Sequence, residues 1–252
     1  MKINSNKLKG RIIAQNGLIE EQKVCLDLQN PIIKNRLSTI IGNNYDKCTK
    51  VNGKHKCDIQ SKNKILKCQI KKYKKNMFQQ LDKNNISVLV NKIHELKDCE
   101  QILRGFCEYP LLPNKTHVDR SKTIKKMSTE FYTDEELKYF IKTLNDNRRK
   151  ILNFVFFGSN IEMQPTYLVG VEYVKNKRTK IIAFEIKKII EYLEKLEFKI
   201  SLKKTTILLG DERIISFQRK GGDSNRKSSN KFQTKIILSK LVKYVDNAIF
   251  YY

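Results

Sequence analysis

The stretch that most constrains the fold is residues 65–71, in which apolar and polar side chains alternate. The apolar members are Leu66, Cys68 and Ile70, and the polar members are Lys67, Gln69 and Lys71. A period of two is typical of a β-strand with one face on a core, so the three polar side chains share the other face. Polar residues 61–64 read as a turn, and the preceding short strand carries Asp58. We therefore predict a hairpin that brings Asp58 beside Gln69 and Lys71.

These three residue types form a chemically useful set. Carboxylate and amide oxygens are ligands for a hard divalent cation such as Mg²⁺. A lysine next to such a cation can offset the negative charge of a phosphate group. The hairpin is therefore a candidate site for a metal ion and a phosphate.

The balance of charge indicates a polyanionic partner. The chain has 252 residues, with 51 Lys and Arg against 26 Asp and Glu, which gives a formal net charge of +25. Residues 64–75 contain six lysines and no acid. A strongly basic chain usually binds nucleic acid. No apolar run approaches the roughly 18 residues of a membrane span, and no secretory leader opens the sequence, so we expect a cytoplasmic protein.

The remaining pattern predicts a mixed helix and strand protein with ample apolar content for a core. Helices are expected over residues 7–29 (interrupted at Gly17), from Pro31 to Gly42, over 86–107 and from Thr133 to Gly158. A basic helix is expected over 74–81 after the hairpin. Strands are expected over 166–174, 179–186, 205–210 and 213–218, with an amphipathic helix at 185–198. Residues 109–123 hold two prolines and form the best candidate boundary, between a segment 1–108 and a segment 109–252. One continuous domain is the alternative.

The spacing Asp58-x10-Gln69-x-Lys71 resembles the motif of the PD-(D/E)xK nuclease superfamily, which includes most type II restriction endonucleases. The second acid of that motif is glutamine here, which resembles a QxK variant. The resemblance implies an α/β fold with a mixed sheet flanked by helices, a nuclease core in 1–108 and a DNA-recognition region in 109–252. It implies Mg²⁺-dependent hydrolysis of double-stranded DNA at a specific site, with Asp58 and Gln69 as metal ligands and Lys71 beside the scissile phosphate. It also implies a cognate DNA methyltransferase as partner and a symmetric homodimer.

Two further features of the family can be placed on this chain. A glutamate from the preceding helix often joins the site, and Glu21 is the candidate, with Glu20 as the alternative. The residues FQQL, at 78–81, resemble part of the helix that follows the site. The order helix, strand, strand, helix supports the choice of Asp58, Gln69 and Lys71.

Two rival sets have similar spacing. One is Asp211-x6-Gln218-x-Lys220, and the other is Glu172 with Glu185-x-Lys187. Glu185 also fits the exposed, ion-paired face of the helix that starts there.

A basic segment near the C-terminus is the candidate for sequence recognition. Residues 215–236 read ISFQRKGGDSNRKSSNKFQTKI. Arginine can pair with guanine and glutamine or asparagine with adenine, while serine and lysine bind phosphate. The predicted DNA-binding residues are Lys72, Lys74, Lys75, Gln218, Arg219, Lys220, Arg226, Lys227, Ser229, Asn230 and Gln233.

Two other interpretations stay open. The hairpin could be a solvated basic surface on a non-catalytic DNA- or RNA-binding protein, with Gln69 and Lys71 on its wet face. The six cysteines contain no CxxC pair and fit reduced thiols. Four residues could instead form a zinc site: Cys48, His55, Cys57 and Cys68.

Overall fold

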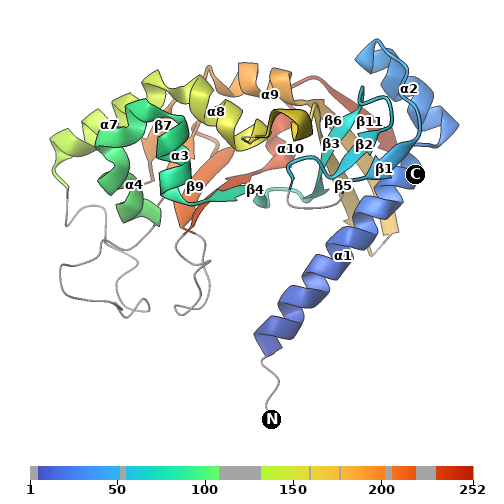
Figure 1. Cartoon of the computed structure of the whole chain (residues 1–252), viewed down its shortest axis with the longest axis horizontal. Helices are drawn as coiled ribbons and strands as arrows, with labels where there is room; N and C mark the ends of the chain where they lie inside the picture. The colour runs from blue at the N-terminus through green and yellow to red at the C-terminus, as the bar shows by residue number, and fades with distance from the viewer. Residues whose placement is uncertain are drawn as a thin grey trace. The chain divides into compact units, whose positions relative to one another are not determined.

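Two β-sheets organise the chain, and helices flank both (Figure 1). The computed structural model describes residues 5–51, 55–107, 132–158, 160–175, 177–201, 206–219 and 231–251. The side chains of residues 5–11, 13, 14, 105–107 and 219 lie outside that description, as does the expected boundary segment at 109–123. The predicted α/β class with helix-flanked sheets is confirmed.

The first sheet has six strands in the order β1-β2-β3-β5-β6-β11. Neighbouring pairs β1–β2, β2–β3, β5–β6 and β6–β11 are antiparallel. Their bounds are β1 Cys48–Lys50, β2 Ile59–Ser61, β3 Lys67–Tyr73, β5 Tyr167–Val174, β6 Lys177–Glu185 and β11 Asn247–Tyr251, and a 3₁₀ turn, η2 Ile161–Met163, precedes β5.

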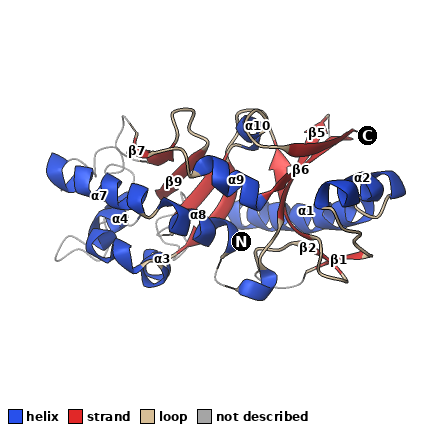
Figure 2. Ribbon diagram, turned by 90° about the horizontal axis from the view of Figure 1, so that it is seen from above, coloured by secondary structure: helices blue, strands red, loops and turns tan. Residues whose placement is uncertain are grey.

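Helices α1 (Ser5–Asp27) and α2 (Pro31–Ile41) cover one face of this sheet (Figure 2). Val24 and Leu28 of α1 and Leu37 of α2 are buried with strand residues such as Val169 and Ile181. Gly17 does not interrupt α1, which runs unbroken through it, so the expected break there was wrong. A glycine inside a helix costs only about 1 kcal/mol, which a long helix can tolerate.

The ends of α2 follow the sequence signals. The side chain of Asn30 accepts a hydrogen bond from the backbone N–H of Ile32, and Pro31 takes the first helical position. Gly42 ends the helix in the left-handed conformation, with φ of 71°. Thr133 and Glu136 likewise form the predicted capping box, in which each side chain accepts a hydrogen bond from the other's backbone N–H.

The second sheet has five strands in the order β4-β10-β9-β8-β7, all antiparallel to their neighbours. The strand bounds are β4 Gln79–Asn84, β7 Phe198–Ile200, β8 Ile207–Leu209, β9 Ile215–Arg219 and β10 Phe232–Ile236. Its helices are α3 Ile86–Lys92, η1 His94–Cys99 (3₁₀), α4 Glu100–Cys107, α7 Asp134–Asp146, α8 Arg148–Phe157, α9 Ile186–Leu193 and α10 Leu238–Leu241.

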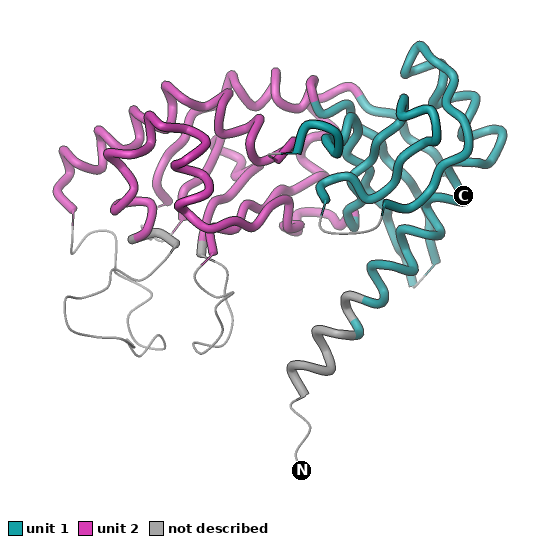
Figure 3. The backbone as a smooth tube through the Cα atoms, in the orientation of Figure 1, with its two compact units in different colours: residues 1–72, 160–186, 247–252 teal, residues 73–159, 187–246 magenta. Residues whose placement is uncertain are grey.

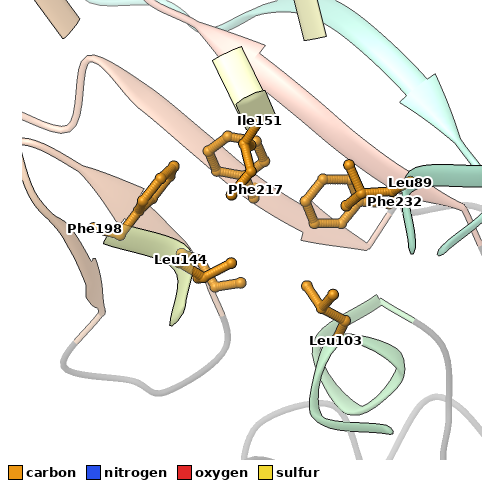
Figure 4. A pocket seen from close by; sticks show the side chains of 8 residues that line it. Leu89, Leu103, Leu144, Ile151, Phe198, Phe217 and Phe232 are labelled. Carbon is orange, nitrogen blue, oxygen red and sulfur yellow. The ribbon is translucent and has the colours of Figure 1, made fainter. Parts of the chain in front are cut away.

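Aromatic rings fill the space between this sheet and its helices. The ring centroids of Phe198 and Phe217 are 5.4 Å apart, and those of Phe217 and Phe232 are 5.2 Å apart. Leu144 of α7 and Ile151 of α8 meet these rings (Figure 4). The cavity left among them is only ≈ 10 Å³, about the size of one water molecule. The sheet therefore has one apolar face that is closed by helices.

The basic helix expected over 74–81 is absent, because residues 79–84 form strand β4. The chain turns at Asn76, whose φ of 56° is left-handed, and whose backbone N–H donates to the hydroxyl of Ser239. Ladder pairing with β10 then overrides the helical tendency of the local sequence.

Two compact units emerge from this pairing (Figure 3). Unit 1 comprises residues 1–72, 160–186 and 247–252, and unit 2 comprises 73–159 and 187–246. This division differs from the expected one at residue 108, because each sheet takes strands from both halves of the chain. The assignment of catalysis to 1–108 and of DNA recognition to 109–252 stays a prediction.

Candidate functional site

The predicted hairpin forms from β2 and β3. Ile59 pairs with Cys68 and Gln60 with Lys67, and Asp58 lies immediately before β2. The backbone N–H of Asp58 donates to the carbonyl of Cys68 at 2.7 Å. In return, the backbone N–H of Ile70 donates to Oδ2 of Asp58 at 2.7 Å. The carboxylate is therefore held by the backbone of β3, the strand that carries Gln69 and Lys71.

The turn between the strands is fixed by its own polar residues. The Ser61 hydroxyl donates to Oδ1 of Asn63 at 2.7 Å and accepts from the backbone N–H of Leu66 at 3.0 Å. Lys64 takes a left-handed φ of 60°. These bonds set the register of β2 and β3, and hence the position of Asp58 along β3.

Alternation along β3 separates two faces. Cys68 and Ile70 pack into the core formed with α1 and α2. Gln69 and Lys71 therefore point to the opposite face. Alternation alone would leave this face exposed to solvent. Gln69 is only 4% exposed, however, and Lys71 is half-buried. The alternative interpretation, in which Gln69 and Lys71 lie on a solvated strand face, does not fit this burial.

The environment of Asp58 is electrostatically mixed. Burial is the main influence and raises the pKa of the Asp58 carboxyl above its usual value of 3.8. The positive charge of Lys71 and the hydrogen bond from Ile70 oppose that rise, whereas the charge of Glu21 adds to it. Lys71 and Glu21 are therefore close enough for their charges to act on the Asp58 carboxyl.

Helix α1 brings Glu21 rather than Glu20 toward Asp58. Glu21 pairs with Lys50 of β1 at 3.4 Å, on the side of the helix that meets the sheet. Glu20 instead accepts from Lys23, one helical turn along, at 3.3 Å. The geometry favours Glu21 among the two candidates.

The zinc alternative is wrong. Throughout the described ranges, no group of three or more His, Cys, Asp and Glu side chains could hold a metal ion, and all four proposed ligands lie within these ranges. Cys48, Cys57 and Cys68 are buried free thiols. Burial raises the pKa of Cys48 to about 12 and that of Cys57 to about 11, so both are neutral thiols in this structure.

A magnesium site makes a different demand on the chain. Mg²⁺ keeps several of its waters and needs only one or two carboxylates from the protein, together with substrate phosphates. Asp58, the amide oxygen of Gln69 and the nearby Glu21 are hard oxygen donors of this kind. A magnesium site of this kind would need no cluster of three acids.

The structure does not assemble the first rival set. Asp211 lies in the turn between β8 and β9, where its side chain is 90% exposed and pairs with Lys199. Gln218 lies near the far end of β9, three residues beyond Ile215, where the strand begins. At about 3.4 Å per residue the two side chains are too far apart to share a ligand. Lys220 lies outside the described residues.

The second rival set is also dispersed. In the β5–β6 ladder Glu185 faces Tyr167, whereas Glu172 faces Lys180, five residues further along. That separation is roughly 17 Å along the strands. Glu172 is occupied by Lys180 at 3.4 Å, and Lys187 is exposed on α9.

The predicted DNA-binding residues fall into three groups. Lys72, Lys74 and Lys75 are exposed at the end of β3 and in the following turn. Gln218 and Gln233 face each other across β9 and β10. The rest lie outside the described side chains: Arg219, Lys220, Arg226, Lys227, Ser229 and Asn230.

A polar residue that contacts one of these predicted DNA-binding residues was not predicted from the sequence. Gln80 of β4 accepts a hydrogen bond from Nε2 of Gln233 at 2.6 Å. It was placed in an expected helix, and the only available signal was the polar pair Gln79-Gln80 before Leu81.

Comparisons with known proteins assign this chain to no family. No protein-family model matches the chain, and no curated protein is similar to it in sequence. Among solved structures, restriction endonuclease MspI in complex with its cognate DNA is similar with a TM-score of 0.46 and 10% identity. The match covers 81% of this chain and 76% of that chain. At this level of similarity it carries no information on catalysis.

The described helices include none that is both long and apolar enough to cross a membrane.

Proposed function

We propose that this chain is a Mg²⁺-dependent endonuclease that hydrolyses double-stranded DNA at specific sites, in the manner of a type II restriction enzyme. The observation that carries the proposal is the position of Asp58. Its carboxylate is bound by the backbone of β3 at 2.7 Å and lies within electrostatic reach of both Lys71 and Glu21. An acid pair and a lysine with this mutual influence can hold a divalent cation and offset the charge of a phosphate.

Each side chain has a distinct role in the proposal. Asp58 and the amide oxygen of Gln69 hold Mg²⁺, which supplies an activated water and neutralises charge on the phosphate when bound. Glu21 adds a second carboxylate from α1. The hydrogen bond from Ile70 orients the Asp58 carboxylate, because it fixes one of the two oxygens.

Lys71 carries the electrostatic part of the chemistry. Its side chain points to the same face as Gln69 and is half-buried, so water screens its charge less than at a fully exposed position. There it orients the attacking water and offsets the charge that builds on the phosphate oxygens. Removing one such preorganised donor usually slows a reaction about 10²- to 10³-fold.

The basic surface supplies binding to the DNA backbone. Lys72, Lys74 and Lys75 are exposed directly beyond the candidate site in sequence. Lysines of this kind position a duplex through its phosphates and carry no sequence information. A homodimer on a palindromic site, a cognate methyltransferase and a cytoplasmic location belong to the same proposal.

A digest with matched variants tests the proposal. Plasmids, with and without methylation, are incubated with the wild-type protein, Asp58→Asn and Asp211→Ala, each with Mg²⁺ and with EDTA. We expect discrete bands from the wild type and from Asp211→Ala in Mg²⁺ alone, and none from Asp58→Asn. DNA that is retarded but uncut in every lane would refute the nuclease and leave a basic binding protein. Loss with Asp211→Ala alone would move the site to unit 2.

A further inference from the structure

The second sheet has a polar face opposite its aromatic one. Phe232 of β10 and Phe217 of β9 point toward the helices, because they line one small cavity with Leu144 and Ile151 (Figure 4). Ile236, four residues beyond Phe232 on β10, is fully buried. Because side chains alternate along a strand, the intervening residues point the other way. On β10 these residues are Gln233 and Lys235, and on β9 they are Ser216 and Gln218.

An irregularity in the ladder adds a residue of β4 to this face. Gln233 pairs with Lys83 and Thr234 with Asp82, but Lys235 pairs with Gln80, so Leu81 is skipped. Strict alternation would have put Gln80 on the side of Asp82. A bulge of this kind re-aims the side chains beyond it. The bond from Nε2 of Gln233 to Oε1 of Gln80 places Gln80 on the polar face.

The result is a platform of three side chains: Gln80, Gln233 and Lys235. Gln80 of β4 is exposed, and Lys235 of β10, which lies opposite it, is half-buried. Gln233, also on β10, is buried, with 7% of its surface exposed. The 2.6 Å bond uses one lone pair of the Gln80 amide oxygen. A second lone pair and both N–H groups of the Gln80 amide have no hydrogen-bond partner among the residues that the structure describes, so they can bind a ligand. Gln233 therefore fixes the plane of an amide that can both donate and accept.

Such an amide suits the edge of a base. In the major groove, N7 of either purine accepts a hydrogen bond, and the neighbouring exocyclic group supplies a second partner. β4 and β10 form the outermost ribbon of their sheet, and the major groove admits a two-stranded ribbon. Lys83, which lies opposite Gln233, and Lys235 bring positive charge that complements DNA.

We propose that Gln80 is a specificity-determining residue that reads a purine in the major groove of duplex DNA, with Gln233 as the residue that positions its amide. The proposal rests on the proposed function only in taking duplex DNA as the ligand. It is independent of the chemistry at Asp58. Lys235 lies directly opposite Gln80 in the ladder, where it meets the adjacent base or its phosphate.

The test separates base reading from catalysis. Random duplex DNA is selected for binding in EDTA, where no cleavage occurs, and the retained sequences are determined for the wild type, Gln80→Ala, Gln233→Ala and Gln79→Ala. Gln79 precedes Gln80 on β4 and pairs with Ile236, so it is the matched control. We expect Gln80→Ala to lose discrimination at one purine position by roughly 5- to 150-fold, the range for one good base contact, while Gln79→Ala retains it.

A modified base provides the second arm. Replacement of that purine by its 7-deaza analogue removes the N7 acceptor and should weaken wild-type binding without further weakening Gln80→Ala. Unchanged discrimination in Gln80→Ala, with the control intact, would overturn the base-reading role even if the protein cuts DNA. Purine discrimination that depends on Gln80 in a protein that never cuts would support it and refute the nuclease. Failure to retain any duplex would refute both.

Discussion

The hydrogen bond between Ile70 and Asp58 allows a quantitative prediction of stability. One of two substitutions at position 58 keeps the acceptor of this bond, and the other removes it. Asp58→Asn keeps an oxygen that can accept from the Ile70 N–H, which lies 2.7 Å from Oδ2 in the native protein. Asp58→Ala removes the acceptor and leaves a part-buried N–H in the middle of β3 without it. An abandoned buried donor costs about 1–3 kcal/mol in free energy of unfolding. For a chain of this size that corresponds to roughly 2–12 °C in Tm. We therefore expect Asp58→Asn to be more stable than Asp58→Ala by that amount.

The same position predicts how stability depends on pH. Burial raises the pKa of the Asp58 carboxyl in the folded state above its usual value of 3.8. A carboxyl with a raised folded pKa contributes fully to stability below its unfolded pKa, and that contribution is lost as pH rises through the folded pKa. The wild type should therefore lose stability relative to Asp58→Asn as the pH increases from below 3.8 toward neutrality. All other titrating groups are shared, so the difference reports this carboxyl together with its coupling to Lys71 and Glu21.

Urea unfolding of the three proteins across this pH range measures both effects, and hydrogen exchange at the Ile70 amide reports the bond directly. Equal stabilities of Asp58→Asn and Asp58→Ala, with an unprotected Ile70 amide, would show that the bond does not hold the carboxylate. A constant difference between the wild type and Asp58→Asn at every pH would show that the carboxyl is not desolvated. Either result removes the physical basis of the candidate site.

Three other experiments have defined expected outcomes. Lys71→Met should slow DNA cleavage about 10²- to 10³-fold while filter binding of DNA is kept, and a loss of binding alone would contradict the catalytic role. Lys72→Ala should reduce the slope of log binding constant against log salt by about 0.9, as one phosphate contact is lost; an unchanged slope would place that lysine away from DNA. At pH 8 the native protein should resist alkylation at Cys48 and Cys57, whose pKa values of about 12 and about 11 leave at most about one thiol in a thousand ionised. Rapid alkylation before unfolding, located by mass spectrometry, would contradict this burial.

Local signals in the sequence were sufficient for local structure. The Asn30-Pro31 start, the Gly42 stop and the Thr133 capping box each depend on residues within a few positions of one another, and all three are confirmed. The alternation over residues 65–71 also predicted β3 correctly. These elements are decided by backbone hydrogen bonds that the nearest side chains satisfy.

Long-range pairing decided what the sequence could not predict. Gln80 lies 153 positions before its hydrogen-bond partner Gln233, and no local pattern shows that residues 79–84 complete a ladder with β10. The bulge that turns Gln80 to the polar face exists only once both strands are present. The interpretation of the polar side of β3 as solvated was wrong for the same reason. Gln69 is buried, and its burial depends on elements distant in sequence.

The burial of Gln69 also explains why an amide suits this position. In the proposed site, a glutamate there would add a third carboxylate to Asp58 and Glu21, and the charge of Glu21 already contributes to the raised pKa of Asp58. Two like charges about 4 Å apart repel by about 4 kcal/mol at the effective dielectric of a protein surface, and by more where burial reduces screening. The amide supplies an oxygen without that repulsion, so Lys71 balances one of two carboxylates rather than one of three. The protein alone then attracts Mg²⁺ less strongly. In the proposed function a DNA phosphate brings the missing negative charge, which couples firm binding of the metal to the arrival of the substrate.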